Sequence, residues 1–418
     1  MTIAEQVAQI AADARQASLA MARLSTTAKN DMLLAMAAAL QEQTVHLIAE
    51  NAADLEAGRE KGLSAAMLDR LMLDEKRIAG IADALREVAA LPDPVGEVTG
   101  MWKRPNELMV GKMRIPLGTI GIIYEARPNV TADAAALCLK AGNAVILRGG
   151  SEAIRSNRAI AEVLQGVMKE LGIPVAALSL IPFTEREGVL EMLKQEEFID
   201  LIIPRGGESL IRFVVENSRI PVIKHYKGVC HIFVDEGADF DMAERIIVNS
   251  KVQRPGVCNA LETILIHKNA AAGFVPRIAA TLSELQVELR GDDEFRSYAP
   301  QATPATEEDW HAEYLELILA CRVVADMDAA IAHINRYGSL HTESIITSDY
   351  SRAQRFIREV NSSCVMVNAS TRFADGNQLG LGAEIGISTT KLHSFGPMGL
   401  EDLTTTKFIV YGDGQIRG

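Results

Sequence analysis

Apolar residues recur at spacings of three and four along the first ninety positions of the chain, which is the pattern of amphipathic helices. The first stripe consists of Ile3, Val7, Ile10, Ala14, Ala17, Met21 and Leu24. Further helices are predicted at Lys29–Asn51, Ser64–Met72 and Glu75–Ala90, with Ser64 as an N-cap. The Leu91-Pro92-Asp93-Pro94 sequence ends this pattern, because proline cannot continue a helix.

The next stretch is short, mildly β-forming and interrupted by glycine and proline. Pro105-Asn106 could turn a hairpin between strands Val98–Lys103 and Leu108–Ile115. Two strands alone are only marginally stable, so the pattern favours a protruding oligomerisation element that packs on something else. An ordinary surface hairpin remains the alternative.

From Thr119 onward, apolar runs alternate with helical stretches, which is typical of a parallel sheet covered on both faces. The predicted strands are Ile120–Tyr124, Ala144–Leu147, Ala177–Ile181, Asp200–Ile203, Val222-Ile223 and His231–Val234. The predicted helices are Ala132–Lys140, Glu152–Leu171, Glu185–Leu193 and Glu208–Glu216. The fold class is therefore α/β.

A second α/β unit is predicted after Asp235. Its strands are Leu261–His267, Leu315–Val324, Ser344–Thr347 and Cys364–Asn368. Its helices are Asp241–Lys251, Ala270–Leu285, Met327–Tyr337 and Ser351–Val360. We predict a loop at Gly291–Trp310 and a strand-like end at Phe408–Val410.

Composition excludes several classes of partner. The 418 residues carry 42 Lys plus Arg against 55 Asp plus Glu, a net charge of −13, so nucleic acid and anionic membranes are not expected partners. Five cysteines without CxxC or metal-ligand spacing argue against a disulfide framework and a structural zinc site, and no metal is expected. With no signal peptide and no membrane-length apolar run, we expect a soluble cytoplasmic protein.

Two junctions run strand, Arg-Gly-Gly, helix. They are Arg148-Gly149-Gly150-Ser151 and Arg205-Gly206-Gly207. Glycines let a backbone approach a ligand, and a helix N-terminus offers N–H groups to an anion, which suits a nucleotide cofactor. Neither junction is GxGxxG, so an ordinary Rossmann pyrophosphate site is not supported, and tight turns without a ligand remain the alternative.

Cys258 lies between a predicted helix and a buried strand, just after Gln253-Arg254-Pro255-Gly256. A tight loop between two rigid elements exposes a side chain while fixing its position, so this loop is a plausible place for a nucleophile. A small buried cysteine that fills a helix–strand junction is the alternative.

Several long motifs resemble the gamma-glutamyl phosphate reductase family of the aldehyde dehydrogenase superfamily. They lie at Glu125–Ala153, Val252–Thr263, Ile334–Thr347 and His393–Val410, in the family's order. The resemblance implies an aldehyde dehydrogenase-like fold with two parallel-sheet α/β domains and a β-arm for oligomerisation. It further implies a cofactor-binding domain (1–98, 119–235 and 373–383), a catalytic domain (236–372) and an arm (99–118 and 384–418).

The resemblance also implies roles for individual residues. Cys258 matches the nucleophile, and Asn129 matches the residue that helps to hold an oxyanion. Arg148 matches a basic residue near the adenosine ribose, and Glu313 falls near the glutamate that binds the nicotinamide ribose. The implied reaction is the NADPH-dependent reduction of L-glutamyl 5-phosphate to L-glutamate 5-semialdehyde and phosphate through a cysteine thioester, in proline biosynthesis.

One departure from the superfamily is informative. Hydrolytic aldehyde dehydrogenases carry a general-base glutamate, but the matching stretch here, Ile223–Gly228, has no carboxylate. An acyl-phosphate reductase does not need that activated water. CoA-acylating and hydrolytic oxidoreductases remain alternatives within the enzymes, and a catalytically idle scaffold for glutamate 5-kinase is the alternative outside them.

A substrate with a carboxylate, an ammonium and a phosphate needs cations in its pocket. Arg254 and Arg372 are candidates by position, and His225, Lys227 and His341 are candidates for the phosphate, although a surface ion pair is an alternative for each. The expected partners are this small-molecule substrate, further copies of the chain, and a complex with glutamate 5-kinase.

Overall fold

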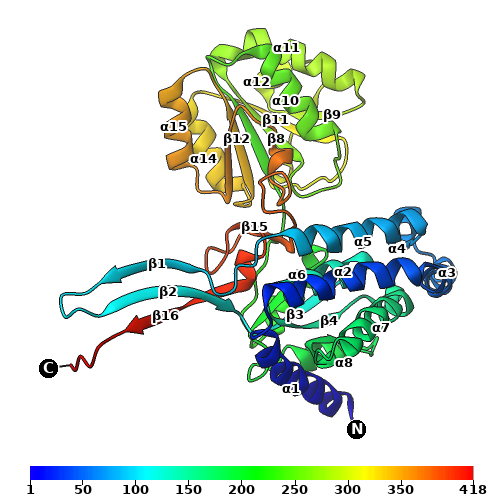
Figure 1. The fold of residues 1–418 in the computed structure, drawn as a ribbon. Coiled ribbons are helices and arrows are strands. Elements are labelled where there is room, and N and C mark those ends of the chain that lie inside the picture. The colour runs from blue at the N-terminus through cyan, green and yellow to red at the C-terminus, as the bar shows by residue number, and fades with distance from the viewer. Residues whose placement is uncertain (418) are drawn as a thin grey trace. The chain divides into compact units, whose positions relative to one another are not determined.

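The computed structural model describes residues 1–417, which form two compact units (Figure 1). The first unit holds Met1–Lys224, Leu381–Gly386 and the chain from Met398 onward, and the second holds His225–Gly380 and Ile387–Pro397. The predicted boundary after residue 235 is therefore displaced. Strand β7 (Cys230–Val234) pairs with strands of the second unit, which draws the boundary back to His225.

The first unit is built on a four-stranded sheet with the order β5-β4-β3-β6. All its pairings are parallel, as predicted. The strands are β3 (Thr119–Tyr124), β4 (Ala144–Arg148), β5 (Leu178–Leu180) and β6 (Leu201–Arg205). Every residue of β3 is buried, as expected for a central strand covered on both faces. Val222 adds only an isolated bridge to Ile202.

Nine helices accompany this sheet in the described part of the first unit, and all of them except α4 share one apolar core with it. They are α1 (Ile3–Met21), α2 (Thr26–Glu42), α3 (Thr44–Glu60), α4 (Ala65–Leu71), α5 (Glu75–Ala90), α6 (Asn129–Lys140), α7 (Ile154–Glu170), α8 (Arg186–Met192) and α9 (Glu208–Asn217). Ser64 caps α4 through its side chain, as predicted. The single helix predicted at Lys29–Asn51 is wrong, because the chain bends by 68° between α2 and α3, where the Thr44 hydroxyl donates to the Gln41 carbonyl.

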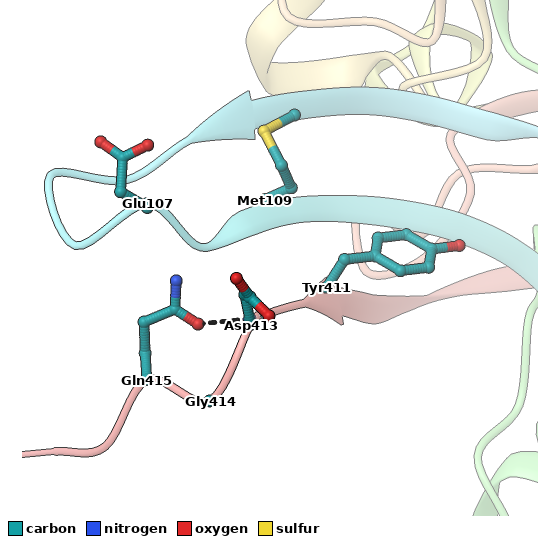
Figure 2. A pocket seen from close by; sticks show the side chains of 7 residues that line it. Glu107, Met109, Tyr411, Asp413, Gly414 and Gln415 are labelled. Atoms are coloured by element: carbon teal, nitrogen blue, oxygen red, sulfur yellow. Dashed lines mark hydrogen bonds between the residues drawn. The ribbon is translucent and has the colours of Figure 1, made fainter.

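The arm has three strands rather than two. Strands β1 (Val98–Lys103) and β2 (Met109–Pro116) form the predicted hairpin, and β16 (Thr404–Tyr411) pairs with the other edge of β2. The arm projects from the helices of the first unit (Figure 1). An open hollow of about 600 Å³ lies at its tip, lined by Glu107, Met109 and the residues from Tyr411 to Gln415 (Figure 2).

The second unit is built on a seven-stranded parallel sheet with the order β10-β9-β11-β8-β7-β12-β13. Besides β7, its strands are β8 (Leu261–His267), β9 (Glu288–Gly291), β10 (Thr303–Pro304), β11 (Ile318–Val324), β12 (Thr342–Ile346) and β13 (Cys364–Val367). Its helices are α10 (Phe240–Val252), α11 (Lys268–Glu284), α12 (Asp293–Tyr298), α13 (Glu307–Trp310), α14 (Met327–Tyr337) and α15 (Tyr350–Glu359).

The loop predicted at Gly291–Trp310 is wrong, because the segment contains α12, β10 and α13. These elements are too short for a periodic pattern, and local polar bonds define the helices. Asp292 caps α12, and Thr306 with Asp309 forms a capping box on α13.

The tail crosses between the units several times. Strands β14 (Gly386–Ser388) and β15 (Gly396–Met398) form a two-stranded ribbon where it does so. The expectation that 373–383 belongs to the first unit is therefore met only from Leu381, and only β16 of the predicted segment 384–418 joins the arm sheet.

Within residues 1–417, no single helix is long and apolar enough to cross a membrane. The bent pair α2 and α3 reaches that length and hydropathy only when the two helices are taken together.

Candidate active site

The loop that carries Cys258 joins the end of α10 at Val252 to the start of β8 at Leu261. Cys258 is half-buried, whereas Cys138, Cys230 and Cys321 are buried. The partial exposure favours an accessible thiol over a cysteine that only fills the core.

The segment Ser370–Ala374, called the strap below, is joined to this loop by hydrogen bonds. The Thr371 hydroxyl donates to the Asn259 carbonyl over 2.7 Å, and the Asn259 side chain donates to the Ala374 carbonyl over 2.9 Å. Because both bonds are made by Asn259, the residue after Cys258, the strap fixes residues far away in sequence beside the loop that carries the thiol.

The strap brings Arg372 near Cys258 and near Arg254, which lies on the Cys258 loop itself. Arg372 donates to the Gln253 side chain over 2.8 Å. Burial and the neighbouring charge of Arg254 lower the pKa of Arg372, while the nearby Cys258 opposes that shift. The structure thus brings Cys258, Arg254 and Arg372 together within the second unit, which suits an anionic substrate.

The backbone of Gly228 lies directly against Cys258. A Cβ atom at Gly228 would lie 1.9 Å from the Cys258 carbonyl oxygen, so only glycine fits there. The Cys230 thiol donates to the same carbonyl over 3.2 Å. Neither Gly228 nor Cys230 carried a signal in the sequence, because the contact joins positions about thirty residues apart on different elements.

Glu313 lies in this same cluster. Its Oε1 atom accepts the Gly228 backbone N–H over 2.8 Å. The carboxylate that the resemblance assigns to the nicotinamide ribose is therefore linked to the peptide that packs on Cys258.

The two predicted phosphate histidines lie next to one another. The rings of His225 and His341 meet edge to face with centroids 5.8 Å apart, and Nδ1 of His225 lies 2.9 Å from the Ile387 carbonyl oxygen. His341 is fully buried, and burial lowers its pKa to about 3. Its imidazole is therefore neutral at pH 7, and the structure gives no support for His341 as a cation that binds phosphate.

In the first unit, Asn129 begins helix α6. Its side-chain Nδ2 donates to the Asp133 carboxylate, one turn along, over 2.8 Å. Burial raises the pKa of Asp133 to about 6, partly opposed by this bond and by Arg205. A carboxamide has two N–H groups, so a bond that uses one of them fixes the direction of the other.

The Arg148-Gly149-Gly150 turn also lies in the first unit, and it leads through a 3-10 turn at Ser151–Ala153 into α7. The Arg148 guanidinium donates to the carbonyls of Gly149 and Thr184, over 3.0 and 2.9 Å. A Cβ atom at Gly149 would lie 2.1 Å from Nδ2 of Asn157, so this glycine lets the turn approach α7.

The second glycine junction is partly occupied by a protein carboxylate. The Gly207 N–H, at the start of α9, donates to Glu125 over 3.1 Å, and a Cβ atom at Gly206 would lie 2.6 Å from the Glu125 carboxyl carbon. A carboxylate thus takes the position expected for a phosphate, which weakens the case for Arg205-Gly206-Gly207 as an anion site.

The first junction also has a carboxylate beside it, because a Cβ atom at Gly150 would lie 2.1 Å from Oε1 of Glu152, but it offers hydrogen-bond donors as well. Nε of Arg148 is buried without a hydrogen-bond partner among the described residues, and the Ser151 side chain is exposed on the same turn. A guanidinium and a hydroxyl are the donors that a ribose phosphate requires. No group of three or more histidine, cysteine or carboxylate side chains suited to a metal occurs between residues 1 and 417.

Comparison with known proteins gives consistent results. The model of the aldehyde dehydrogenase family matches residues 2–317. Gamma-glutamyl phosphate reductases of Geobacter metallireducens and Geotalea daltonii are 80% and 79% identical to this chain over 417 residues, covering all of both chains.

Solved structures agree with these relatives. The gamma-glutamyl phosphate reductase of Thermotoga maritima has a TM-score of 0.97 and 45% identity, covering 99% of this chain and all of its own. An acetylating aldehyde dehydrogenase from Geobacillus thermoglucosidasius, at 17% identity, has a TM-score of 0.70 over 100% of this chain and 98% of its own. The second likeness is one of fold alone.

Proposed function

This chain belongs to the aldehyde dehydrogenase family and, within it, to the gamma-glutamyl phosphate reductases, and on that premise we propose that it reduces L-glutamyl 5-phosphate to L-glutamate 5-semialdehyde and phosphate. This is a reductive step of proline biosynthesis. The observation that carries the proposal is the half-buried Cys258 on a pinned loop, with Arg254 and Arg372 beside it.

In the proposed reaction, the Cys258 thiolate attacks the acyl carbonyl carbon of the substrate. An S–C bond forms, the bond from carbon to the phosphate oxygen breaks, and inorganic phosphate leaves with the electron pair. The side-chain N–H of Asn129 and the backbone N–H of Cys258 are the proposed donors to the oxyanion. A reduced nicotinamide, when bound, would supply a hydride to the thioester carbon, and the semialdehyde would then leave as its S–C bond breaks and the electron pair returns to the Cys258 sulfur.

The thioester must survive until it is reduced. The stretch Ile223–Gly228 carries no carboxylate that could activate water. Gly228, the last residue of this stretch, packs its backbone against the Cys258 carbonyl. The absence of a base here supports exchange with phosphate rather than hydrolysis.

We propose that Arg254 and Arg372 bind the anionic groups of the substrate, because both lie close to the thiol. Lys227 and His225 are the remaining candidates for the phosphate. His341 is no longer proposed, since it is buried and neutral.

The family's cofactor is a nicotinamide nucleotide, and we propose a preference for NADP. The support is the Arg148, Gly149, Gly150 and Ser151 turn, where the guanidinium could pair with a 2′-phosphate. An engineered glycolyl-CoA reductase of the same fold has been solved with NADP⁺ bound.

We also propose that the arm assembles copies of the chain in the cytoplasm. Trp102, Val110 and Val410 lie side by side in register across the three strands, and Phe408 is next on the same face. Trp102, Phe408 and Val410 are exposed, so this face suits a second copy. A complex with glutamate 5-kinase would protect the labile acyl phosphate and is the second proposed assembly.

The deciding experiment measures NADP reduction by glutamate 5-semialdehyde, with and without phosphate, for wild type and Cys258→Ala. Activity that requires phosphate and disappears in the variant supports the proposal. Activity without phosphate would indicate a hydrolytic dehydrogenase, and activity that needs CoA instead would indicate an acylating one. No activity in either protein would favour the scaffold.

A further inference from the structure

Two oppositely charged side chains, Lys251 and Glu262, are buried at the two ends of the nucleophile loop. Nζ of Lys251 lies 2.7 Å from Oε2 of Glu262, and both side chains are 0% exposed. Lys251 is in the last turn of α10 and Glu262 is the second residue of β8, so the pair closes the base of the loop that carries Cys258.

Such a pair is not explained by stability. Removing both charges from water costs several kcal/mol per ion, and apolar replacements of similar volume are often as stable or more so. Burial raises the pKa of Glu262 to about 7, which shows how little solvation its carboxylate has. Because stability does not explain the pair, its role is inferred from the other groups that Lys251 and Glu262 contact.

The pair holds a third segment as well as the two loop ends. Oε1 of Glu262 accepts the Leu315 backbone N–H over 3.3 Å, and Nζ of Lys251 lies 5.8 Å from the centroid of the Tyr314 ring. Leu315 has a φ of +57°, a conformation that is strained for a leucine and persists only where neighbours impose it. The segment that includes Glu313 is thus held against the base of the nucleophile loop.

From Glu313 the contacts return to the nucleophile. Glu313 accepts the Gly228 N–H over 2.8 Å, and the Gly228 backbone packs on the Cys258 carbonyl. One continuous set of contacts therefore runs from the ion pair to Glu313, through Gly228, and back to Cys258, all within the second unit.

We propose that Lys251 and Glu262 are positioning residues that fix the nucleophile Cys258 and the ribose-binding Glu313 relative to one another. The role of Cys258 rests on the proposed function and the role of Glu313 on the family resemblance, whereas the contacts between them rest on neither. Reacting groups misplaced by about 1 Å can lose about a hundredfold in rate, so this link would set the efficiency of hydride transfer to the thioester.

The test replaces the pair by apolar residues, Lys251→Met with Glu262→Leu. The matched control is Lys29→Met with Asp93→Leu in the first unit. This ion pair is also buried, with 2.9 Å between Nζ and Oδ2 and side chains that are 1% and 5% exposed. Asp93, like Glu262, also accepts a backbone N–H, that of Val95. Folding is checked by urea midpoints. The readouts are the rate and pH dependence of Cys258 alkylation by iodoacetamide, followed by peptide mass spectrometry without substrate, and kcat and KM for NADPH.

We expect the Lys251/Glu262 double variant to fold, to show a shifted alkylation profile, and to lose about tenfold to a hundredfold in kcat with a raised KM for NADPH. The control should stay within about twofold of wild type in all of these, as expected for a distant site. A folded double variant with the wild-type alkylation profile and kcat would overturn the proposal.

Two further outcomes are separable. If the double variant does not fold, Lys251→Met with Glu262→Gln is used, because it keeps the acceptor for Leu315 while it removes both charges. Wild-type alkylation and KM in that variant would likewise overturn the proposal. If wild type lacks reductase activity, the proposed function fails, but the alkylation profiles still decide whether the pair positions Cys258.

Discussion

The backbone of Gly228 and the carbonyl oxygen of Cys258 are so close that a Cβ atom on Gly228 would lie 1.9 Å from that oxygen. The same peptide of Gly228 donates its N–H to Glu313. A single glycine therefore separates the nucleophile's backbone from the carboxylate that is predicted to bind the cofactor ribose. Any side chain at this position must displace one or both of them.

Gly228→Ala is expected to lower kcat by about a hundredfold or more, because backbone rather than a flexible side chain must give way. Gly166→Ala is the control, since a Cβ atom at Gly166 in helix α7 meets nothing within 4 Å. Steady-state kinetics and urea midpoints should show a loss of activity only in the first variant. Near-normal kcat in Gly228→Ala would mean that the nucleophile loop tolerates movement.

Asp133→Asn is expected to lower kcat by about tenfold with little change in KM. An ionised carboxylate only accepts hydrogen bonds, so it forces the Asn129 carboxamide to present its nitrogen, whereas an amide at 133 would also allow the flipped orientation. A double-mutant cycle with Asn129→Ala checks the mechanism. Full additivity of the two losses would show that Asp133 does not act through Asn129.

The Asp133 carboxyl should also make the free energy of unfolding depend on pH. Its pKa is raised from 3.8 to about 6 in the folded protein, so between these values the folded state binds the proton more tightly than the unfolded chain does. The free energy of unfolding therefore falls as the pH rises through this window, by about 1 to 3 kcal/mol. The Asp133→Asn variant has no carboxyl to ionise at this position and therefore does not lose this stability as the pH rises. It should be more stable than wild type at pH 7 and similar to wild type near pH 4.

Urea unfolding at pH 4, 5 and 7 measures that difference. The control is Asp31→Asn, at an exposed position of helix α2. A constant difference between Asp133→Asn and wild type across the three pH values would contradict the expected linkage.

Local periodicity predicted much of the fold. The helices at Glu75–Ala90 and Met327–Tyr337 and the strand at Leu261–His267 have the predicted limits, because each buries one regular face or a whole apolar run. Periodicity did not predict the pairing of β16 with β2, since it joins residues almost three hundred positions apart, although the family resemblance had placed both segments in the arm. The break at Gln43, where the Thr44 hydroxyl donates to the Gln41 carbonyl, leaves the apolar pattern unchanged, so periodicity did not predict it.

The candidate site shows the same division. The loop around Cys258 was evident from Pro255 and Gly256 between a helix and a strand. The contacts that hold it, from Gly228, Cys230 and the Lys251–Glu262 pair, are set by how the sheet strands assemble. The burial of a charged residue such as Glu262 cannot be read from its residue type, because charged residues are usually exposed and are buried only where a partner pairs with the charge.

The Arg148→Met variant should bind NADPH more weakly than wild type does, with a smaller effect on the binding of NADH. If the guanidinium pairs with the 2′-phosphate, its loss should raise KM for NADPH by about tenfold to a hundredfold and leave KM for NADH almost unchanged. The ratio of the two KM values is the measurement, and NADH serves as the internal control for general damage to the turn. Equal changes for both nucleotides would assign Arg148 to the structure of the turn, through its bonds to Gly149 and Thr184.

The arginines beside Cys258 should make its thiol prefer anionic reagents. The Arg372 charge interacts with both Arg254 and Cys258, so negatively charged iodoacetate should be enriched at this thiol relative to neutral iodoacetamide. Arg372→Met should lower the ratio of the two alkylation rates by about threefold to tenfold, and it should raise KM for the acyl phosphate. Arg336→Met, which removes an exposed ion pair with Glu307, is the control and should leave the ratio unchanged. Because the ratio compares two reagents on one thiol, any general change in the reactivity of Cys258 cancels, and an unchanged ratio in Arg372→Met would exclude Arg372 from the anion-binding site.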